Sequence, residues 1–227
     1  MSQQLKQQQQ KPKTPFTRAY LILGIFSLIL GVTLGVYTSN LPVAKPQLNA
    51  ATLLEPPKSI AEPGLIDHNG QPFGLKELRG KWHFVFFGYT HCPDVCPTTL
   101  FIFKSVAKQL KENHDLYNKT RFILTSVDPE RDQSNVLKQY VQFYNPDFIG
   151  LTGDNTKIYN FSRAMGVIYA RNKPLNNDPN NYHVDHGASV LLLNPEGKLQ
   201  AVFSAPIKPD DLLKDFHSIV TYYKDKH

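Results

Sequence analysis

The sequence predicts an α/β domain, a mixed β-sheet flanked by helices, that follows a single N-terminal transmembrane helix. Three short apolar runs, at residues 82–88, 121–127 and 148–151, alternate with amphipathic segments, as the buried strands of a parallel sheet do. Two further apolar runs, at 189–193 and 199–203, flank the turn Asn-Pro-Glu-Gly and predict an antiparallel hairpin. The transmembrane helix is predicted by a long uncharged stretch near the N-terminus.

Residues 19–38 are almost entirely apolar, and roughly 20 such residues cross the hydrocarbon core of a bilayer. The segment has no polar face, which a buried core helix of this length would show. Because residues 1–18 hold four basic residues and no acid, the positive-inside rule predicts a cytoplasmic tail there and places the rest of the chain outside. The alternative is a cleaved signal peptide, but residues 41–44 (LPVA) have proline where a cleavage site needs a small residue.

Residues 39–63 contain five prolines without helical or strand periodicity, so we expect an extended linker there and a folded domain over 64–227. The net charge of the chain is +6, of which residues 1–60 carry +5, and a nearly neutral domain argues against a nucleic-acid partner. Hydrophobic residues at 41% and charged residues at 19% exclude a wholly disordered chain. Two cysteines exclude a disulfide-dense scaffold and a zinc site of four thiolates.

The domain begins with an N-terminal β-hairpin, because Asn69-Gly70 is a strong turn signal between two short strands. After strand 82–88, Pro97 is suited to begin a helix. The later elements are expected to be strand 121–127, helix 134–143, strand 148–151, a helix from Asp154 or Asn155 to 165, a Pro/Asn-rich segment 171–184, the hairpin 189–203 and helix 210–223. This order, with paired cysteines after the first long strand, is a thioredoxin-like arrangement. In open sheets the reactive site lies at the carboxyl ends of the strands, which places it at residues 88–97.

Both cysteines lie in residues 88–97, whose sequence is GYTHCPDVCP. A spacing of four predicts that Cys92 and Cys96 share one face of a helical turn, and a helix N-terminus lowers the pKa of a thiol. Two such thiolates can close a disulfide or share a soft metal, and thiolates favour Cu(I) over zinc and hard cations. The alternative, two small buried hydrophobes, fits poorly with a loop that contains prolines and Asp94.

A metal site with two thiolates needs a third donor. His183 and His186 precede the strand 189–193, in a loop that faces the cysteine-bearing helix in a thioredoxin-like sheet. We expect His186, the nearer to the strand, to be the third ligand, and Asp185 to help orient it or its neighbours.

Two further residues are expected near the ligands without binding metal. His91 is next to Cys92 in sequence, and Asp128 follows strand 121–127 at the same rim of the sheet. His83 lies inside an apolar strand and is expected to be a core histidine. The remaining histidines are expected at the surface: His68, His114, His217 and His227.

Three motifs together resemble the Sco/SenC family of copper-binding proteins. They are GYTHCPDVCP at 88–97, SVDPERD at 126–132 and VDH at 184–186, and the resemblance spans approximately residues 54–223. It implies a membrane-anchored, thioredoxin-fold assembly factor for the dinuclear copper centre of cytochrome c oxidase. It also implies that the copper ligands are Cys92, Cys96 and His186.

The first functional hypothesis is therefore a metallochaperone, which carries Cu(I) to the oxidase subunit with the dinuclear copper site and uses no nucleotide. Cu(II) is also compatible, because imidazole and water suit it. The second is a thiol–disulfide oxidoreductase that reduces the cysteines of the oxidase copper site. Either role implies a thiol reductant in an oxidising compartment, and delivery implies another copper donor.

A peroxidase acting through Cys92 is a third hypothesis, disfavoured because a single nucleophile would not require His186. For the location, we expect a single-pass protein of a bacterial inner membrane. Its N-terminus would be cytoplasmic and its functional domain periplasmic.

Overall fold

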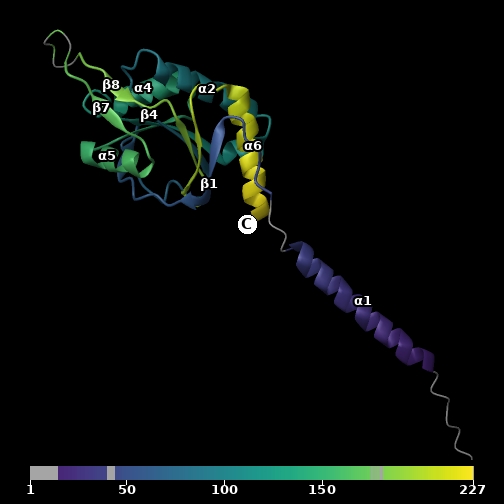
Figure 1. Cartoon of the computed structure of the whole chain (residues 1–227). Coiled ribbons are helices and arrows are strands. Elements are labelled where there is room, and N and C mark those ends of the chain that lie inside the picture. The colour runs from purple at the N-terminus through teal and green to yellow at the C-terminus, as the bar shows by residue number, and fades with distance from the viewer. Residues whose placement is uncertain (1–14, 40–43, 175, 177, 179–180, 227) are drawn as a thin grey trace, which may run out of the picture. The chain divides into compact units, whose positions relative to one another are not determined.

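The computed structural model describes residues 15–39, 44–174, 176, 178 and 181–226 (Figure 1). The chain divides into two compact units between Ala44 and Lys45. The expected cytoplasmic tail lies outside the described residues up to residue 14, as do residues 40–43 of the expected linker.

The first unit contains one helix, α1, at Pro15–Ser39. Its window Ala19–Val36 has a mean hydropathy of 2.3, and none of its residues is buried. Among the described residues this is the one helix long and apolar enough to cross a membrane. It covers the segment in which the sequence predicts a transmembrane helix.

The second unit is built around an eight-stranded mixed sheet. Its strands are β1 Ala51–Lys58, β2 Leu65–Asp67, β3 Pro72–Phe73, β4 Trp82–Gly88, β5 Thr120–Ser126, β6 Ile149–Thr152, β9 Val190–Leu193 and β10 Leu199–Phe203, in the order β1-β10-β9-β4-β5-β6-β2-β3. The centre, β4-β5-β6, is parallel, and all other neighbours pair antiparallel. Every residue of β4 is buried, which explains its continuous apolar sequence. The predicted mixed sheet and both predicted hairpins are confirmed.

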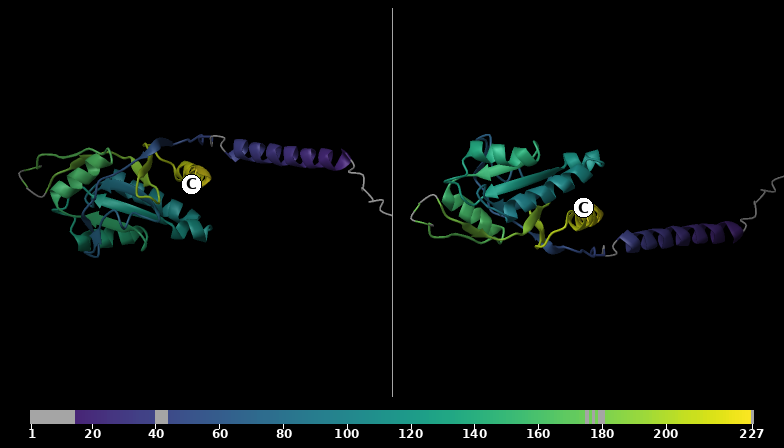
Figure 2. Two further views of the ribbon diagram at one scale, coloured as in Figure 1. Left: turned by 90° about the horizontal axis from the view of Figure 1, so that it is seen from below. Right: turned by 90° about the horizontal axis from the view of Figure 1, so that it is seen from above.

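Helices lie on both faces of this sheet (Figure 2). They are α2 Val95–Leu110, α3 His114–Asn118, α4 Ser134–Tyr144, α5 Asn155–Ala164 and α6 Pro209–Lys226. Because side chains alternate along a strand, Phe84 of β4 meets α2 and α6, with ring centroids 6.2 Å from Phe103 and 4.9 Å from Phe216. Phe87 points to the other face and meets Phe161 of α5 at 5.5 Å. These buried aromatic rings fix both helix layers to the strand that leads into residues 88–97.

The expected linker over residues 39–63 is wrong in its second half. Residues 51–58 form β1, which pairs antiparallel with β10 at the edge of the sheet. The prolines at 56 and 57 are compatible with this position, because an edge strand leaves one row of backbone groups unpaired and the pairing register shifts between Leu53 and Lys58. Proline content alone therefore did not distinguish an edge strand from a tether.

Three smaller differences concern element bounds. Helix α2 begins at Val95, two residues before the expected Pro97. The segment 171–184 is not wholly irregular, because β7 (Tyr169–Arg171) and β8 (Val184–His186) form a separate antiparallel pair at its ends. The short helix α3 was not predicted.

The chain before β1 is held by a buried carboxylate of α6. Asp215, 1% exposed, accepts hydrogen bonds from the backbone N–H groups of Asn49 at 2.9 Å, Ala50 at 2.7 Å and Ala51 at 2.9 Å. Since these donors are distant in sequence from α6, the carboxylate ties the start of β1 and the chain before it to the C-terminal helix.

We predict that Asp215→Ala destabilises the domain by about 2–4 kcal/mol, because three backbone donors lose a charged acceptor. Urea unfolding of the chain in non-ionic detergent, followed by the fluorescence of Trp82, the one tryptophan, measures this change. Asp225→Ala removes an exposed carboxylate from the same helix and should shift stability by less than about 0.5 kcal/mol. Equal stabilities of the two variants would contradict the role assigned to Asp215.

Candidate metal centre

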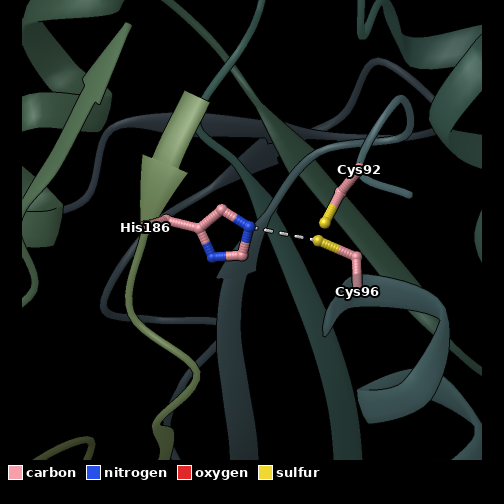
Figure 3. Close-up of side chains that lie close together, drawn as sticks. All are labelled: Cys92, Cys96 and His186. Atoms are coloured by element: carbon pink, nitrogen blue, oxygen red, sulfur yellow. Dashed lines mark hydrogen bonds between the residues drawn. The ribbon is translucent and has the colours of Figure 1, made fainter. Parts of the chain in front are cut away.

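The structure brings two thiols and one imidazole together at the carboxyl end of β4 (Figure 3). The ligand atoms of Cys92, Cys96 and His186 all lie within 4.8 Å of one another. The Sγ of Cys96 is 3.4 Å from the Nε2 of His186. Among the described residues, this is the group of His, Cys, Asp and Glu side chains whose geometry suits a metal ion.

The two cysteines reach this point from different local structures. Cys96 is in the first turn of α2, whereas Cys92 lies in the loop before the helix. The prediction that both share one face of a helical turn is therefore wrong, and the loop brings Cys92 back over the helix start. Gly88 makes room for Cys96, because a Cβ there would lie 2.6 Å from the Sγ of Cys96.

The two thiols differ in protonation. Hydrogen bonds with Cys96, with the imidazole of His186 and with backbone N–H groups lower the pKa of Cys92 to about 3, although burial opposes them. The hydrogen bond between the two cysteines and burial raise the pKa of Cys96, whose side chain is fully buried. The expected lowering of the thiol pKa is therefore found for Cys92 and not for Cys96, and its main cause is the hydrogen bond with Cys96 rather than the helix N-terminus. Without metal, the pair holds one thiolate and one thiol that donates to it.

The imidazole of His186 is fixed by a backbone carbonyl and two rings. Its Nδ1 lies 3.0 Å from the carbonyl oxygen of Gly187 and donates to it, since a carbonyl oxygen can only accept, and its Nε2 faces the sulfur of Cys96. The rings of Phe86 and Tyr89 stand edge-on to the imidazole at 5.7 Å each. An imidazole that donates through Nδ1 binds a metal through Nε2, once Nε2 carries no proton.

Asp132 supports the loop that carries Cys92, a role that the sequence did not reveal. It is fully buried and accepts hydrogen bonds from the backbone N–H of Thr90 at 3.0 Å and from the hydroxyl of Ser126 at 2.7 Å. Burial raises the pKa of this carboxyl. The only available sequence signal was its place in the motif at 126–132, where helix capping was a sufficient explanation.

Asp128 supports the opposite side of the site. Its buried carboxylate accepts a hydrogen bond from the hydroxyl of Tyr182 at 2.7 Å and pairs with Arg131. The guanidinium of Arg131 stacks on the ring of Tyr182 at 3.6 Å and donates to the Tyr182 carbonyl at 3.1 Å. Since Tyr182 lies just before β8, Asp128 acts on the segment that carries His186 rather than on the cysteine loop.

The other predicted neighbours of the site lie further from it. Asp185 is exposed and accepts a hydrogen bond from the side chain of Asn172 at 3.2 Å, so this bond holds a neighbouring segment and not the ring of His186. His91 is exposed, with its Nδ1 3.0 Å from the hydroxyl of Thr90, and it belongs to the same loop as Cys92 without joining the three ligands.

Two histidines outside the site are buried. His83 is 1% exposed, as expected of a core histidine, and burial lowers its pKa to about 4. His68, expected at the surface, is 7% exposed because its Nδ1 accepts a hydrogen bond from the backbone N–H of Gly150 at 2.9 Å.

Two sulfurs and one imidazole nitrogen within bonding reach of a common point form a donor set for a soft, three-coordinate ion. The same two sulfurs are also close enough for thiol–disulfide chemistry. The site is therefore suited either to metal binding or to redox exchange. Fold and site together define the class of protein: a thioredoxin-like domain with a Cys-Cys-His group.

The comparisons with known proteins agree with this class. Residues 55–221 match the SCO1/SenC family model. The SCO2-like protein of Rickettsia prowazekii is 34% identical over 198 residues, which cover 86% of this chain and 94% of that protein. Two solved structures are described as ScoI with copper bound. That from Arabidopsis thaliana is 30% identical, with a TM-score of 0.66, and the match covers 72% of this chain and 99% of that one. That from Bradyrhizobium japonicum is 32% identical, with a TM-score of 0.62, and the match covers 72% of this chain and 98% of that one.

The chain belongs to the SCO1/SenC family. The resemblance that the three motifs carry is thereby confirmed, and so is the thioredoxin-like fold.

We predict that the thiolate of Cys92 makes it reactive at acid pH. In the reduced, metal-free chain, iodoacetamide should modify Cys92 at a nearly constant rate between about pH 5 and pH 8, because its lowered pKa leaves it ionised throughout. Cys96 should stay unmodified. Removing the hydrogen-bond donor in Cys96→Ala should raise the pKa of Cys92 and slow its reaction at the acid end, and Cys96→Ser should restore part of the rate.

Peptide mass spectrometry measures both modifications. A wild-type rate for Cys92 that rises about tenfold per pH unit across this range would show an ordinary thiol and contradict the assignment.

Proposed function

We propose that this protein binds copper through Cys92, Cys96 and His186 and delivers it to the dinuclear copper centre of cytochrome c oxidase. The observation that carries the proposal is the convergence of the three ligand atoms within 4.8 Å. Thiolate sulfur and neutral imidazole favour Cu(I), and imidazole with water also suits Cu(II). The copper-bound state of two related structures supports the choice of ion.

Copper would leave the site by ligand exchange. Cys92 lies in a loop and is half-buried, whereas Cys96 is buried in the first turn of α2. An acceptor ligand therefore reaches the metal from the side of Cys92 and His186, while Cys96 holds it until the transfer is complete. The exposed side of the site is thus the side of exchange.

The apolar helix α1 supports a membrane-anchored donor. With basic residues preceding it, the anchor would place the functional domain in the periplasm and the N-terminus in the cytoplasm of a bacterium. Confinement to the membrane surface raises the concentration of donor around a membrane-bound oxidase subunit without any further contact. The same topology calls for a thiol reductant and a copper source in the periplasm.

A second candidate function is the reduction of a disulfide in the oxidase copper site. The stable thiolate of Cys92 beside the thiol of Cys96 supports it, since this is the arrangement of an attacking and a resolving cysteine. The imidazole of His186 has no necessary part in such an exchange. Its placement at 3.4 Å from a sulfur therefore favours metal delivery as the main role.

We predict one Cu(I) per chain, with His186→Ala weakening Cu(I) binding at least about tenfold, or ~1.4 kcal/mol, because one of three donors is lost. Anaerobic titration of the reduced chain against a colorimetric Cu(I) competitor measures the affinity. His91→Ala is the matched control, since His91 is exposed in the same loop as Cys92 but is not among the three ligands.

Unchanged affinity in His186→Ala would remove this histidine from the metal site. A wild-type chain that reduces a disulfide of the oxidase domain rapidly, with His186→Ala equally active, would move the reductase function ahead of delivery.

A further inference from the structure

Four aromatic side chains of α2 and α4 form a cluster that we call the aromatic face: Phe101, Tyr140, Phe143 and Tyr144. The ring of Tyr144, 6% exposed, lies beneath the others, with centroid distances of 5.1 Å to Phe101, 5.6 Å to Tyr140 and 5.3 Å to Phe143. Phe101 is 54% exposed and Phe143 is 74% exposed. Single exposed apolar residues are ordinary, but rings that pack together and remain exposed mark an interaction surface.

The aromatic face adjoins the metal site. Phe101 follows Cys96 by five residues on α2, which at 1.5 Å per residue is a rise of about 7.5 Å along the helix axis. The rings of Tyr144 and Tyr140 continue the cluster from Phe101 onto α4. Phe101 continues the helix α2 that begins at the site. A molecule that covers the aromatic face consequently also lies near the first turn of α2, which holds Cys96.

The charged side chains within helices α2 and α4 have one sign. Helices α2 and α4 contain no Asp or Glu, and their three lysines, Lys104, Lys108 and Lys138, are exposed. Lys104 and Lys108 follow Phe101 at spacings of three and seven, which places them on the same side of α2. An apolar centre with a basic border is complementary to a partner with an apolar patch bordered by acids.

We propose that the aromatic face docks the protein that exchanges copper with Cys92, Cys96 and His186, and that this partner presents an apolar patch bordered by Asp and Glu. The inference rests on the proposed function and adds the surface and the chemistry of the partner. Ligand exchange requires the partner's donor atoms to approach the sulfurs to bonding distance, so the surface beside the sulfurs is covered at that moment. Aromatic anchors supply most of the affinity in such contacts, and the lysines guide the approach.

Two other occupants fit less well. A second copy of this chain, related by a two-fold axis, would bring the Lys104 and Lys108 stripes of both copies against each other. A membrane with anionic lipids would satisfy the rings and the lysines, but it gives no reason for the aromatic face to lie near the turn that holds Cys96.

The test measures copper transfer and copper affinity separately. The full chain is placed in nanodiscs of zwitterionic lipid, loaded with one equivalent of Cu(I), and mixed with the purified soluble domain of the oxidase subunit that carries the dinuclear copper site. The double variant F101S/F143S should slow transfer at least about tenfold and leave Cu(I) affinity unchanged. K104E/K108E, which alters only exposed positions of α2, should slow transfer as well, and rising salt should slow the wild type. Tyr159→Ser, a change at a 53% exposed aromatic side chain of α5, should have no effect.

Each remaining outcome counts against the proposal. Unchanged transfer in both multiple variants overturns it, and so does a wild type that holds copper but transfers none to the oxidase domain. Hydrogen-exchange protection of α2 that appears only in nanodiscs with anionic lipid would assign the face to the membrane. Self-association that is lost in F101S/F143S would assign it to a second copy. If the wild type fails to bind Cu(I) in the competitor titration, the proposed function itself fails, and this is seen before any variant is compared.

Discussion

The approach of one imidazole to two sulfurs is the contact on which the rest of the account depends. It joins parts of the chain that are 90 residues apart, since the Sγ of Cys96 and the Nε2 of His186 meet at 3.4 Å. Neither side chain is held by the other alone. Cys96 is placed by the first turn of α2 and by the absence of a side chain at Gly88, whereas His186 is placed by β8 and the carbonyl of Gly187.

Two buried aspartates hold the ligand-bearing segments in position relative to each other. Asp132 ties the loop before α2 to the end of β5, and Asp128 ties the chain before β8 to the same end of β5 through Tyr182 and Arg131. Both carboxylates come from one short segment, although they serve opposite sides of the site. Buried carboxylates with several hydrogen bonds resist displacement, because removing one partner leaves the others unsatisfied. The segment at 126–132 thus holds both ligand-bearing segments in place and supplies no ligand itself.

Much of this arrangement could be predicted from the sequence, for definite reasons. Strands such as β4 and β5 are buried on both faces, so their continuous apolar runs identify them without any knowledge of their neighbours. Cys92 and Cys96 could be assigned because both lie directly after such a strand, where open sheets place their reactive residues. His186 followed from the fold class and not from its own surroundings in the sequence.

What could not be predicted depends on tertiary contacts. Strand β1 contains prolines and is recognisable only through its pairing with β10. Asp132 and Asp128 occupy similar places in one motif, and only the packed structure shows which of them faces the cysteine loop. Asp185 was assigned by its position next to His186, but neighbouring residues of a strand point to opposite faces. The side chain beside a ligand in sequence is for that reason a poor guide to the group that orients it.

The central claim is that two sulfurs and one imidazole nitrogen hold a single copper ion. X-ray absorption spectroscopy of the reduced chain loaded with one equivalent of Cu(I) tests it most directly, because it counts the donor atoms by element. Two sulfur scatterers and one nitrogen from imidazole per copper are expected. A spectrum with sulfur neighbours alone, or one that is the same in His186→Ala, would contradict the account.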